Sequence, residues 1–388
     1  MKKSNNALRL FSIAFYKELW DVATSLSSMI LIVGGMVAYG LLYNLLYQPN
    51  IVREDPIVVV DNSHTHISRH LISLVDASPN AEIVAVAADI SEAHSVLSRG
   101  EAEAILYLPH DMDKRIGRGE QSLFVILSTT ATFLYYEATV GAIEDTMLAL
   151  NEDIRGDMLW ILPAPLAVAL DGHATTEVVG NALFNPTKGY ADYLVPAVFM
   201  VIIFQTMVMV VSMNSAGRKA KRITPMRGRT IGFGGRVVIT LARSATYCTI
   251  YGALSLFLIG WLPRIFHLPH LASVWELVAM MFPFLLATSL FGQAFGRLFN
   301  DREAPLVLIT FFSVGLIFIS DISYPLQLLP MGWQAVHYLF PIAPAILAFV
   351  ELGSMGSSLA DITPQLSVMW LQVGGYLILA TLIPHDFR

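Results

Sequence analysis

A dense group of basic residues lies between positions 214 and 236, in the stretch NSAGRKAKRITPMRGRTIGFGGR. It contains no acidic residue, and none occurs anywhere between Asp192 and Glu276. Clustered Lys and Arg side chains can neutralise the phosphates of a nucleic acid. The flanks, YLVPAVFMVIIFQTMVMVVSM and SATYCTIYGALSLFLIGWLP, argue against this, because each is uncharged and about as long as the roughly 20 residues that cross a bilayer. A short basic segment between two such spans is typical of a cytoplasmic loop.

Three polar side chains inside apolar stretches are candidates for a transport conduit, namely Arg243, Gln205 and Gln293. Charged residues within membrane spans often mark substrate pathways. Arg243 lies near the end of its span, however, so its long stem could also carry the charge to the membrane surface. The glutamines, with Gln372, could instead form hydrogen bonds between helices.

Motifs of conventional catalysis are missing from the sequence. There is no G-x-x-x-x-G-K-[ST] phosphate loop, no G-x-S-x-G turn, no H-E-x-x-H and no C-x-x-C. We therefore expect no enzyme activity, no cofactor and no metal in this chain. His66 and His70 are four residues apart and could share a helix face as metal ligands do, but no further ligand is evident, and a solvated helix start explains them equally.

The composition is that of an integral membrane protein. Of 388 residues 55% are hydrophobic and only 14% are charged, and the mean hydropathy is +0.59. Soluble domains carry about 25% charged residues. The single cysteine, Cys248, excludes a disulfide within the chain. The first apolar run is too long for a cleaved signal peptide and predicts a retained helix at 25–47.

Uncharged windows predict six transmembrane helices. These windows are 22–52, 193–217, 244–263, 277–296, 304–320 and 362–385. The segment 322–361 is apolar but contains Pro325, Pro330, Pro341 and Pro344, so we expect an external hairpin of two short helices that dip into the membrane edge. A span within 158–170 is not expected, because Pro163 and Pro165 interrupt it.

The distribution of basic residues predicts the orientation. Lys2, Lys3, Arg9, Lys17, the basic loop 214–236, Arg297, Arg302 and Arg388 all fall on one side of six spans. The positive-inside rule assigns that side, and both termini, to the cytoplasm. Residues 48–192 are then extracytoplasmic, and 193–388 hold helices two to six.

Residues 48–192 have the pattern of an α/β domain. Apolar runs PIVVVD, AEIVAVA, AEAILYLP and QSLFVILS predict four strands, and two helices separate the first three. Asp89 and Glu92 form a capping signal for the second helix, which Gly100 ends. Residues 133–150 predict a longer helix that leads back to the membrane.

The N-terminal segment 1–24 predicts an amphipathic helix on the inner membrane surface. Leu8, Phe11, Phe15 and Leu19 recur at helical spacing, whereas Arg9, Lys17 and Glu18 lie elsewhere. A simple extension of the first span fits the pattern equally well.

With this layout the chain resembles the ABC-2 type transporter permease family, in the subgroup with a large external domain between spans one and two. The resemblance rests on VVDNSHTHISRHLISLVDASP with EAHSVLSRGEAEAILYLPHDMDKRIGRGE, on FNPTKGYADYLVPA before span two, and on SYPLQLLPMGWQAVHYLFPIAPA before span six. No one motif is specific, but their order and spacing are.

The resemblance implies a membrane subunit of an ATP-driven exporter that moves substrate outward from the cytoplasm or inner leaflet. It implies a cytoplasmic ATPase subunit, a second permease subunit (the same or homologous), in some cases a periplasmic adaptor, and the bacterial inner membrane. The family's R-E-x-G-T turn that contacts the ATPase reads NSAGRKAKRITP here, with the glycine but without the glutamate. The implied docking residues are Gly217, Arg218, Lys219, Lys221, Arg222 and Thr224.

A membrane-anchored sensor or assembly factor, whose external domain binds a ligand or partner, is the alternative function. Six spans favour transport, because a sensor needs only one or two. Binding of membrane lipids by the basic loop is expected in either case, and nucleic acid is not an expected partner.

Overall fold

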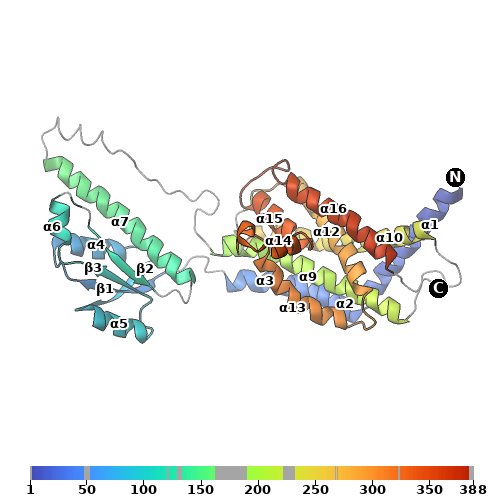
Figure 1. Cartoon of the computed structure of the whole chain (residues 1–388), viewed down its shortest axis with the longest axis horizontal. Helices are drawn as coiled ribbons and strands as arrows, with labels where there is room; N and C mark the ends of the chain where they lie inside the picture. Colours follow the sequence, from blue (N-terminus) through green and yellow to red (C-terminus); the bar gives the residue numbers. More distant parts are fainter. Residues whose placement is uncertain are drawn as a thin grey trace. The chain divides into compact units, whose positions relative to one another are not determined.

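The computed structural model describes residues 2–47, 53–118, 120, 122–128, 133–161, 190–221, 232–266, 268, 270–321 and 324–383. The chain folds as two compact units (Figure 1). The first, here called the membrane unit, is Met1–Gln48 with Leu183–Arg388, and the second, the α/β unit, is Pro49–Ala182.

The α/β unit is built on a four-stranded sheet in the order β2-β1-β3-β4. The strands are β1 (Asp55–Asp61), β2 (Ala81–Ala87), β3 (Ala104–Leu108) and β4 (Val125–Ser128). β1 pairs in parallel with β2 and β3, and β4 pairs antiparallel with β3. All four predicted strands are thereby confirmed. Parallel pairs need crossover connections, which the intervening helices provide.

Helices cover both faces of this sheet. Ile57 and Val59 face a core shared with α4 (His66–Asp76), α6 (Met112–Gly117) and α7 (Phe133–Ile161). Val58 and Val60 face a second core under α5 (Ile90–Ser98). Burial on both faces explains why the β1 sequence is continuously apolar rather than alternating.

The predicted cap of α5 is confirmed in detail. The Asp89 side chain accepts a hydrogen bond from the Glu92 backbone at 2.8 Å, and the Glu92 side chain accepts one from the Ala88 backbone at 2.8 Å. Gly100 follows the helix with a φ of 71°, which glycine adopts without strain. α7 extends the predicted 133–150 helix to Ile161, and the rest of the 158–170 stretch lies outside the described residues.

The membrane unit is a helical bundle. In chain order its helices are α1 (Lys2–Ala23), α2 (Leu26–Met29), η1 (Ile30–Gly35), α3 (Met36–Leu46), α9 (Tyr190–Lys221), α10 (Phe233–Ser255), η2 (Leu256–Trp261), α11 (Leu262–Ile265), α12 (Val274–Gly296), α13 (Ala304–Phe318), η3 (Leu326–Leu328), α14 (Met331–His337), α15 (Ile342–Gly353) and α16 (Thr363–Leu382). Among the described residues, five helical segments are long and apolar enough to cross a membrane. They are Leu26–Leu46, Leu194–Arg218, Phe233–Ile265, Val274–Gly296 and Thr363–Leu382.

The predicted count of six depends on two further elements. α13 occupies the predicted fifth span but has 15 residues, about 22 Å at 1.5 Å per residue, against a hydrocarbon core of about 30 Å. α14 and α15 would together make one span, bent by 75°. Six spans therefore stay a prediction, whereas the expected two short helices of the hairpin are confirmed.

The four hairpin prolines begin helices rather than break them. Pro325, Pro330 and Pro341 precede the first residues of η3, α14 and α15, and Pro344 lies in the first turn of α15. A helix start has no intrahelical partner for its first N–H groups, so proline costs little there.

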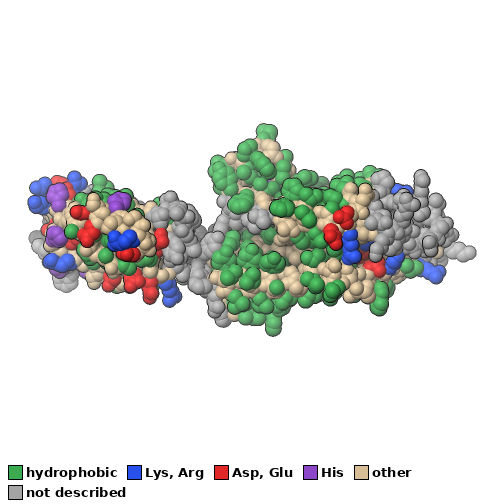
Figure 2. All heavy atoms as spheres, turned by 90° about the horizontal axis from the view of Figure 1, so that it is seen from below, with side chains coloured by type: hydrophobic (Ala, Val, Ile, Leu, Met, Phe, Trp, Pro, Cys, Tyr) green, Lys and Arg blue, Asp and Glu red, His purple; other side chains and the backbone are tan. Residues whose placement is uncertain are grey.

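α9 forms the centre of the bundle. In its span Leu194–Arg218, 89% of the most apolar window is buried, against 22% for Leu26–Leu46. α12 packs closely on it, because Gly296 lets the backbone of Ser212 approach. The outer surface is apolar: Figure 2 shows hydrophobic side chains over most of the visible face of this unit, with charged side chains gathered toward one end. Ile30, Phe311 and Leu371 are 59–78% exposed, as expected of a lipid-facing surface.

Two predicted boundaries of the basic loop are wrong. α9 continues as a helix to Lys221 and α10 begins at Phe233, so residues 214–221 and 233–236 of the predicted loop 214–236 are helical. The third span likewise begins before its uncharged window, since Phe233–Ile265 includes Arg236 and Arg243. These helices extend past their uncharged windows because Arg218 and Arg243 have an acidic partner inside the bundle, described below.

The N-terminal segment forms its own helix, as the first of the two interpretations predicted. α1 ends at Ala23, Ser25 is extended (φ −88°, ψ 107°) and caps α2, and the first span follows. The predicted apolar face is only partly correct, because Leu8 is 66% exposed and Glu18 is buried.

Candidate functional site

A buried ion pair joins the N-terminal helix to the core of the bundle. Glu18 on α1 is 2% exposed, and both of its carboxylate oxygens accept hydrogen bonds from Nη1 of Arg218 on α9, at 2.6 and 2.8 Å. Tyr247 on α10 donates its hydroxyl to Glu18 Oε1 at 2.6 Å, and Arg243 Nε lies 3.5 Å from Oε2. We call these four side chains the Glu18 cluster.

Helical spacing on α1 brings Glu18 into this position. Ala14, Glu18 and Val22 are four residues apart, and all three are buried. Ala14 packs against Ile239 and Ala242 of α10, and the small alanines allow the two helices to approach closely. The face of α1 that enters the bundle therefore carries one carboxylate between apolar contacts.

Polar residues from α9 and from one further helix, α2, extend the cluster. Asn214 of α9 donates to the Tyr247 hydroxyl at 3.1 Å, and Ser28 of α2 donates to the Asn214 amide oxygen at 3.4 Å. Asn214 thus links α2, α9 and α10 at the end of the first and second candidate spans.

A second polar layer connects α10 with α12. Gln293 is fully buried and donates to the Thr240 carbonyl at 3.2 Å and to the Ser244 hydroxyl at 2.8 Å. Arg297 is 1% exposed and lies 3.5 Å from the Thr240 hydroxyl. Gln372 donates to the Tyr338 carbonyl at 2.8 Å, which ties α16 to the hairpin. Gln293 therefore forms interhelical hydrogen bonds, which were one of its two predicted roles, and Gln372 forms the hydrogen bond to another part of the bundle that was its one predicted role.

The chemistry of the Glu18 cluster is structural rather than catalytic. Its carboxylate is fully occupied by Arg218, Tyr247 and Arg243, so no oxygen is free to act as a base. Buried charges are tolerated when they are paired and hydrogen-bonded, and removal of one partner is then strongly destabilising. The cluster fixes α1 against α9 and α10.

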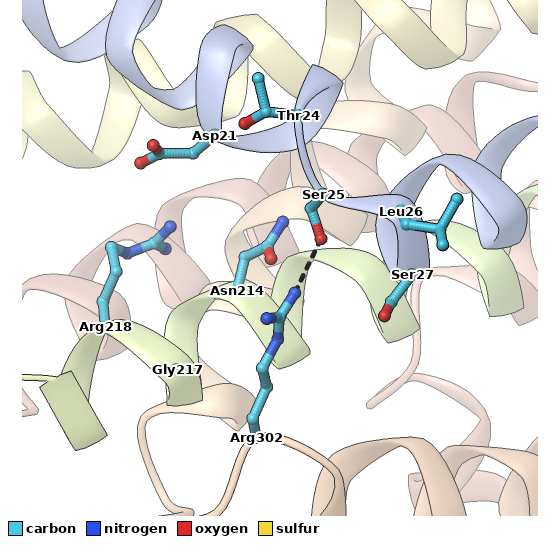
Figure 3. A pocket seen from close by; sticks show the side chains of 9 residues that line it. All are labelled: Asp21, Thr24, Ser25, Leu26, Ser27, Asn214, Gly217, Arg218 and Arg302. Carbon is cyan, nitrogen blue, oxygen red and sulfur yellow. Dashed lines mark hydrogen bonds between the residues drawn. The ribbon is translucent and has the colours of Figure 1, made fainter.

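A polar cavity of about 390 Å³ lies beside this cluster. Figure 3 shows it between the α1–α2 junction, the end of α9 and the turn that carries Arg302. Nη2 of Arg302 donates to the Ser25 hydroxyl at 2.8 Å, across the cavity (Figure 3). The stem of Arg302 passes over Gly217, where a built Cβ would lie 3.4 Å from Arg302 Cδ.

An apolar cavity of about 260 Å³ lies elsewhere in the bundle. Its walls come from α9, α12, α13 and the hairpin, and include Phe204, Phe291, Phe312 and Phe340. Half of its described lining residues are phenylalanines, and among those described Ser313 is the one polar residue. Such a cavity can hold a hydrophobic molecule or an acyl chain.

The structure describes four of the six predicted docking residues. Gly217 is not part of a turn, as the resemblance implied, but lies inside helix α9 under the Arg302 stem. Arg218 is 8% exposed and paired with Glu18. Lys219 and Lys221 belong to the last turns of α9, and Arg222 and Thr224 lie outside the described residues. ATPase docking by this segment stays a prediction.

The predicted conduit residues do not meet in one place. Arg243 is 4% exposed and faces Glu18, so its side chain does not extend along the outside of the bundle, and it lines neither of the two cavities. Gln293 lies between α10 and α12, and Gln205 on α9 is half-buried; neither lines the two cavities. Sequence reasoning missed Glu18. The available signal was two arginines in the stretch between Asp192 and Glu276, which contains no acidic residue.

The histidines of the α/β unit form a small surface contact. His66 and His70 stack on one side of α4, with ring centres 6.5 Å apart, and His70 Nε2 lies 2.9 Å from Asp153 Oδ2 on α7. In the part of the chain that the structure describes, no group of three or more His, Cys, Asp or Glu side chains could hold a metal ion.

Together these features define a multi-pass membrane protein: an apolar helical bundle, closed by a buried ion pair, with a small α/β unit between its first two candidate spans. A family model for ABC-2 family transporter proteins matches residues 20–382, and the chain belongs to that family. Its members are membrane components of transporters, generally not enzymes themselves, and they partner with an ABC ATPase subunit. No curated protein matches the sequence significantly.

Proposed function

We propose that the chain is a permease subunit of an ATP-driven exporter, that it pairs with a second permease subunit, and that its substrate is lipophilic. The observation that carries the substrate class is the apolar cavity between α9, α12, α13 and the hairpin. A cavity with almost no polar lining gives no hydrogen bonds to a polar substrate, and removal of apolar surface from water is its main source of binding energy.

Export is proposed from the resemblance together with the orientation of the basic residues. With the α/β unit in the periplasm and both termini in the cytoplasm of a bacterial cell, a periplasmic adaptor could dock on that unit. The energy must come from a separate ATPase, because the sequence has no phosphate loop. Lys219, Lys221, Arg222 and Thr224 remain the proposed contacts for that ATPase, whereas Arg218 is already paired with Glu18.

Transport of a lipophilic fluorescent compound by vesicles tests this proposal. The vesicles contain the chain with the ATPase that co-purifies with it, and a variant ATPase without its phosphate-loop lysine is the control. We expect ATP-dependent transport, and no ATP hydrolysis by the chain purified away from every ATPase. Absence of transport, with ligand binding retained by the α/β unit, would favour the sensor alternative.

Two neighbouring phenylalanines on α13 test the role of the cavity. Phe312 lines it, whereas Phe311 does not, and both side chains are exposed, by 61% and 78%. We expect Phe312→Gln to lower the transport rate, because a polar amide in the cavity lacks partners. Phe311→Gln is the matched control, since it places the same amide on the outer surface. Equal rates for the two variants would exclude this cavity as part of the substrate path.

A further inference from the structure

The polar cavity lies where three candidate spans end. Ser25 precedes the span Leu26–Leu46, Arg218 ends the span Leu194–Arg218, and Arg302 follows the span Val274–Gly296. If these helices cross the bilayer, the cavity lies at the depth of the lipid headgroups. In Figure 3 the side chains that line it come from all three places.

The lining offers hydrogen-bond donors to an anion. It consists of the two guanidinium groups of Arg218 and Arg302, the hydroxyls of Thr24, Ser25 and Ser27, the Asn214 amide, the exposed carboxylate of Asp21, Gly217 and the side chain of Leu26. Asp21 is the one acidic side chain among these lining residues, and it would repel an anion. Arginine is the side chain best suited to phosphate, because its N–H groups can pair with two oxygens at once.

Arg218 has unused donor capacity. Only its Nη1 is bonded to Glu18, and among the described residues Nε and Nη2 have no hydrogen-bond partner although both are buried. The side chain as a whole is 8% exposed and stands at the wall of the cavity, as Figure 3 shows. A buried N–H group without a partner costs free energy, so a ligand that supplies oxygen atoms here is favoured.

Neither arginine at the cavity wall is saturated by a carboxylate. Arg218 shares Glu18 with Arg243, and Arg302 has no carboxylate partner among its described hydrogen bonds, although the exposed Asp301 and Glu303 are its neighbours in the sequence. The two guanidinium groups would attract an anion that enters the cavity, and more strongly than at an open surface because the site is partly shielded from water.

An apolar surface leads away from the cavity. Leu26 lines it and is 75% exposed, and Ile30 and Val33, one and two turns further along the first span, are 59% and 43% exposed. A free phosphate would make no use of this surface, whereas the acyl chains of a phospholipid would cover it.

We propose that the cavity between the α1–α2 junction, the end of α9 and the turn carrying Arg302 binds the phosphate of an anionic phospholipid. Arg218 and Arg302 hold the phosphate oxygens, the hydroxyls of Ser25 and Ser27 contribute hydrogen bonds, and the acyl chains lie against Leu26, Ile30 and Val33. A lipid bound in this way holds α1 and α2 to α9 at the membrane surface.

Lipid titration followed by native mass spectrometry tests the site on the full chain in detergent. The probes are phosphatidylglycerol, diacylglycerol with the same acyl chains but no phosphate, and inorganic phosphate. We expect one tightly bound phosphatidylglycerol and no comparable binding of diacylglycerol. Arg302→Gln should weaken the tight site at least about tenfold, as expected from the loss of a charge-assisted hydrogen bond.

A pair of variants at Ser27 separates binding from folding. Ser27 is exposed and lies in the first turn of its helix, where an acidic residue is favourable for the helix. Ser27→Asp should therefore leave the fold intact and yet repel the phosphate, lowering affinity at least about tenfold, while Ser27→Ala removes only one hydroxyl and should lower affinity clearly less. Arg9→Gln removes an exposed cation from α1 and is the control for general attraction to anionic lipid.

Three results would overturn the proposal. Equal lipid affinity in wild type, Arg302→Gln and Ser27→Asp would show that the cavity does not hold the lipid. Displacement of phosphatidylglycerol by millimolar inorganic phosphate would assign the site to the free anion. Unchanged lipid affinity with weaker co-purification of the ATPase would assign the arginines to a protein contact. Transport activity enters none of these readouts, so the exporter function can fail independently.

Discussion

Glu18 is the acidic member of the Glu18 cluster and pairs there with residues about 200 positions away in the sequence. Between Asp192 and Glu276 the chain has no acid of its own, so Arg218 and Arg243 have no acidic neighbour within that stretch. The Glu18 carboxylate of α1 pairs with both arginines. The N-terminal helix is thereby a structural part of the bundle and not only a surface anchor.

Glu18→Gln should therefore destabilise the protein strongly. The variant keeps the shape of the side chain but leaves two buried guanidinium groups without a counter-charge, and such losses cost about 3–5 kcal/mol. Thermal unfolding of the detergent-solubilised chain, followed by tryptophan fluorescence, measures the effect. The exposed Arg9→Gln on the same helix is the control and should unfold as wild type does.

A second substitution distinguishes the ion pair from a general packing effect. In the double variant Arg218→Gln with Glu18→Gln, the carboxylate is absent, and so is one of the two cations that it neutralises in the wild type. The double variant should thus lose less stability than the sum of the two single variants. Strict additivity would mean that Glu18 and Arg218 do not interact in the folded protein.

Asp55 is the clearest titrating group of the α/β unit. It begins β1, is fully buried, and accepts a hydrogen bond from Thr139 of α7. Burial, with a smaller effect of the neighbouring Glu103 carboxylate, raises the pKa of Asp55 from 3.8 to about 7. The neutral form is therefore favoured in the folded unit.

The stability of the α/β unit should fall as the pH rises through 7. Because the folded pKa of Asp55 is raised, its contribution is fully present below about pH 4 and is lost as the pH increases through about 7. Asp55→Asn should remove this dependence, making the variant more stable than wild type at pH 8 and nearly equal at pH 4. Hydrogen exchange of the β1 amides at several pH values, corrected for intrinsic rates, measures it. A wild type that gains β1 protection between pH 5 and 8 would contradict the assignment.

Local signals predicted single residues well and distant pairings poorly. The Asp89 cap and Gly100 were read correctly because both act within a few residues of chain. Glu18 was assigned to the polar face of α1, since spacing alone does not reveal that a buried arginine from another helix faces it. The prolines were read as helix breaks within the hairpin, and they prove to be the residues that begin its helices.

At the scale of whole elements, periodicity and charge-free windows predict the presence of a helix or strand reliably. They predict its first and last residues poorly. Every predicted strand and helix of residues 55–128 is present, because alternating short apolar runs and helical spacing are strong local signals. α9 and α10 both extend beyond their windows, because charge excludes a residue from lipid but not from a bundle interior that supplies a partner.

The contact between α9 and α12 depends on a glycine. A Cβ at Gly296 would collide with the carbonyl oxygen of Ser212 and lie 2.7 Å from its Cα. Because that obstacle is backbone, it cannot rotate away. Close approach of helices at small residues is a main source of stability for membrane bundles.

Gly296→Ala should force the two helices apart and lower stability by about 1–3 kcal/mol. Gly315→Ala is the matched control, since a Cβ at Gly315 on α13 meets nothing within 4 Å and alanine favours the helix. Fluorescence-detected size-exclusion chromatography after a temperature series compares the two. A Gly296→Ala variant as stable as the Gly315→Ala variant would show that α9 and α12 are not in close contact.

At the scale of the whole molecule, the structure supports one part of the predicted orientation. Hydrogen bonds and ion pairs bring together the α1–α2 junction, the end of α9, the first half of α10 and the turn after α12. These are the places where the basic residues gather in sequence. The span ends that carry the basic residues therefore lie at one end of the membrane unit, as the positive-inside rule requires. The assignment of that end to the cytoplasm remains a prediction.

Labelling of introduced cysteines with a membrane-impermeant maleimide tests that assignment on a Cys248→Ser background. Ser12 on α1, Ser98 on α5 and Met331 on α14 are all exposed. We expect labelling of Ser98→Cys and Met331→Cys in spheroplasts, and of Ser12→Cys only after the membrane is opened. The opposite pattern would invert the orientation and place the α/β unit in the cytoplasm.

A fourth position tests whether the number of spans is even, as six spans require. If the 15-residue α13 crosses the bilayer and the hairpin α14–α15 does not, α16 ends in the cytoplasm, and Ile383→Cys should react only after the membrane is opened. If neither α13 nor the hairpin crosses, α16 runs in the other direction, and Ile383→Cys should react in intact spheroplasts. Ser12→Cys in the same preparation confirms that the membrane is sealed. We expect the first result, because Arg297 and Arg302 on one side of α13 and the apolar hairpin on the other match the charge asymmetry of a crossing helix.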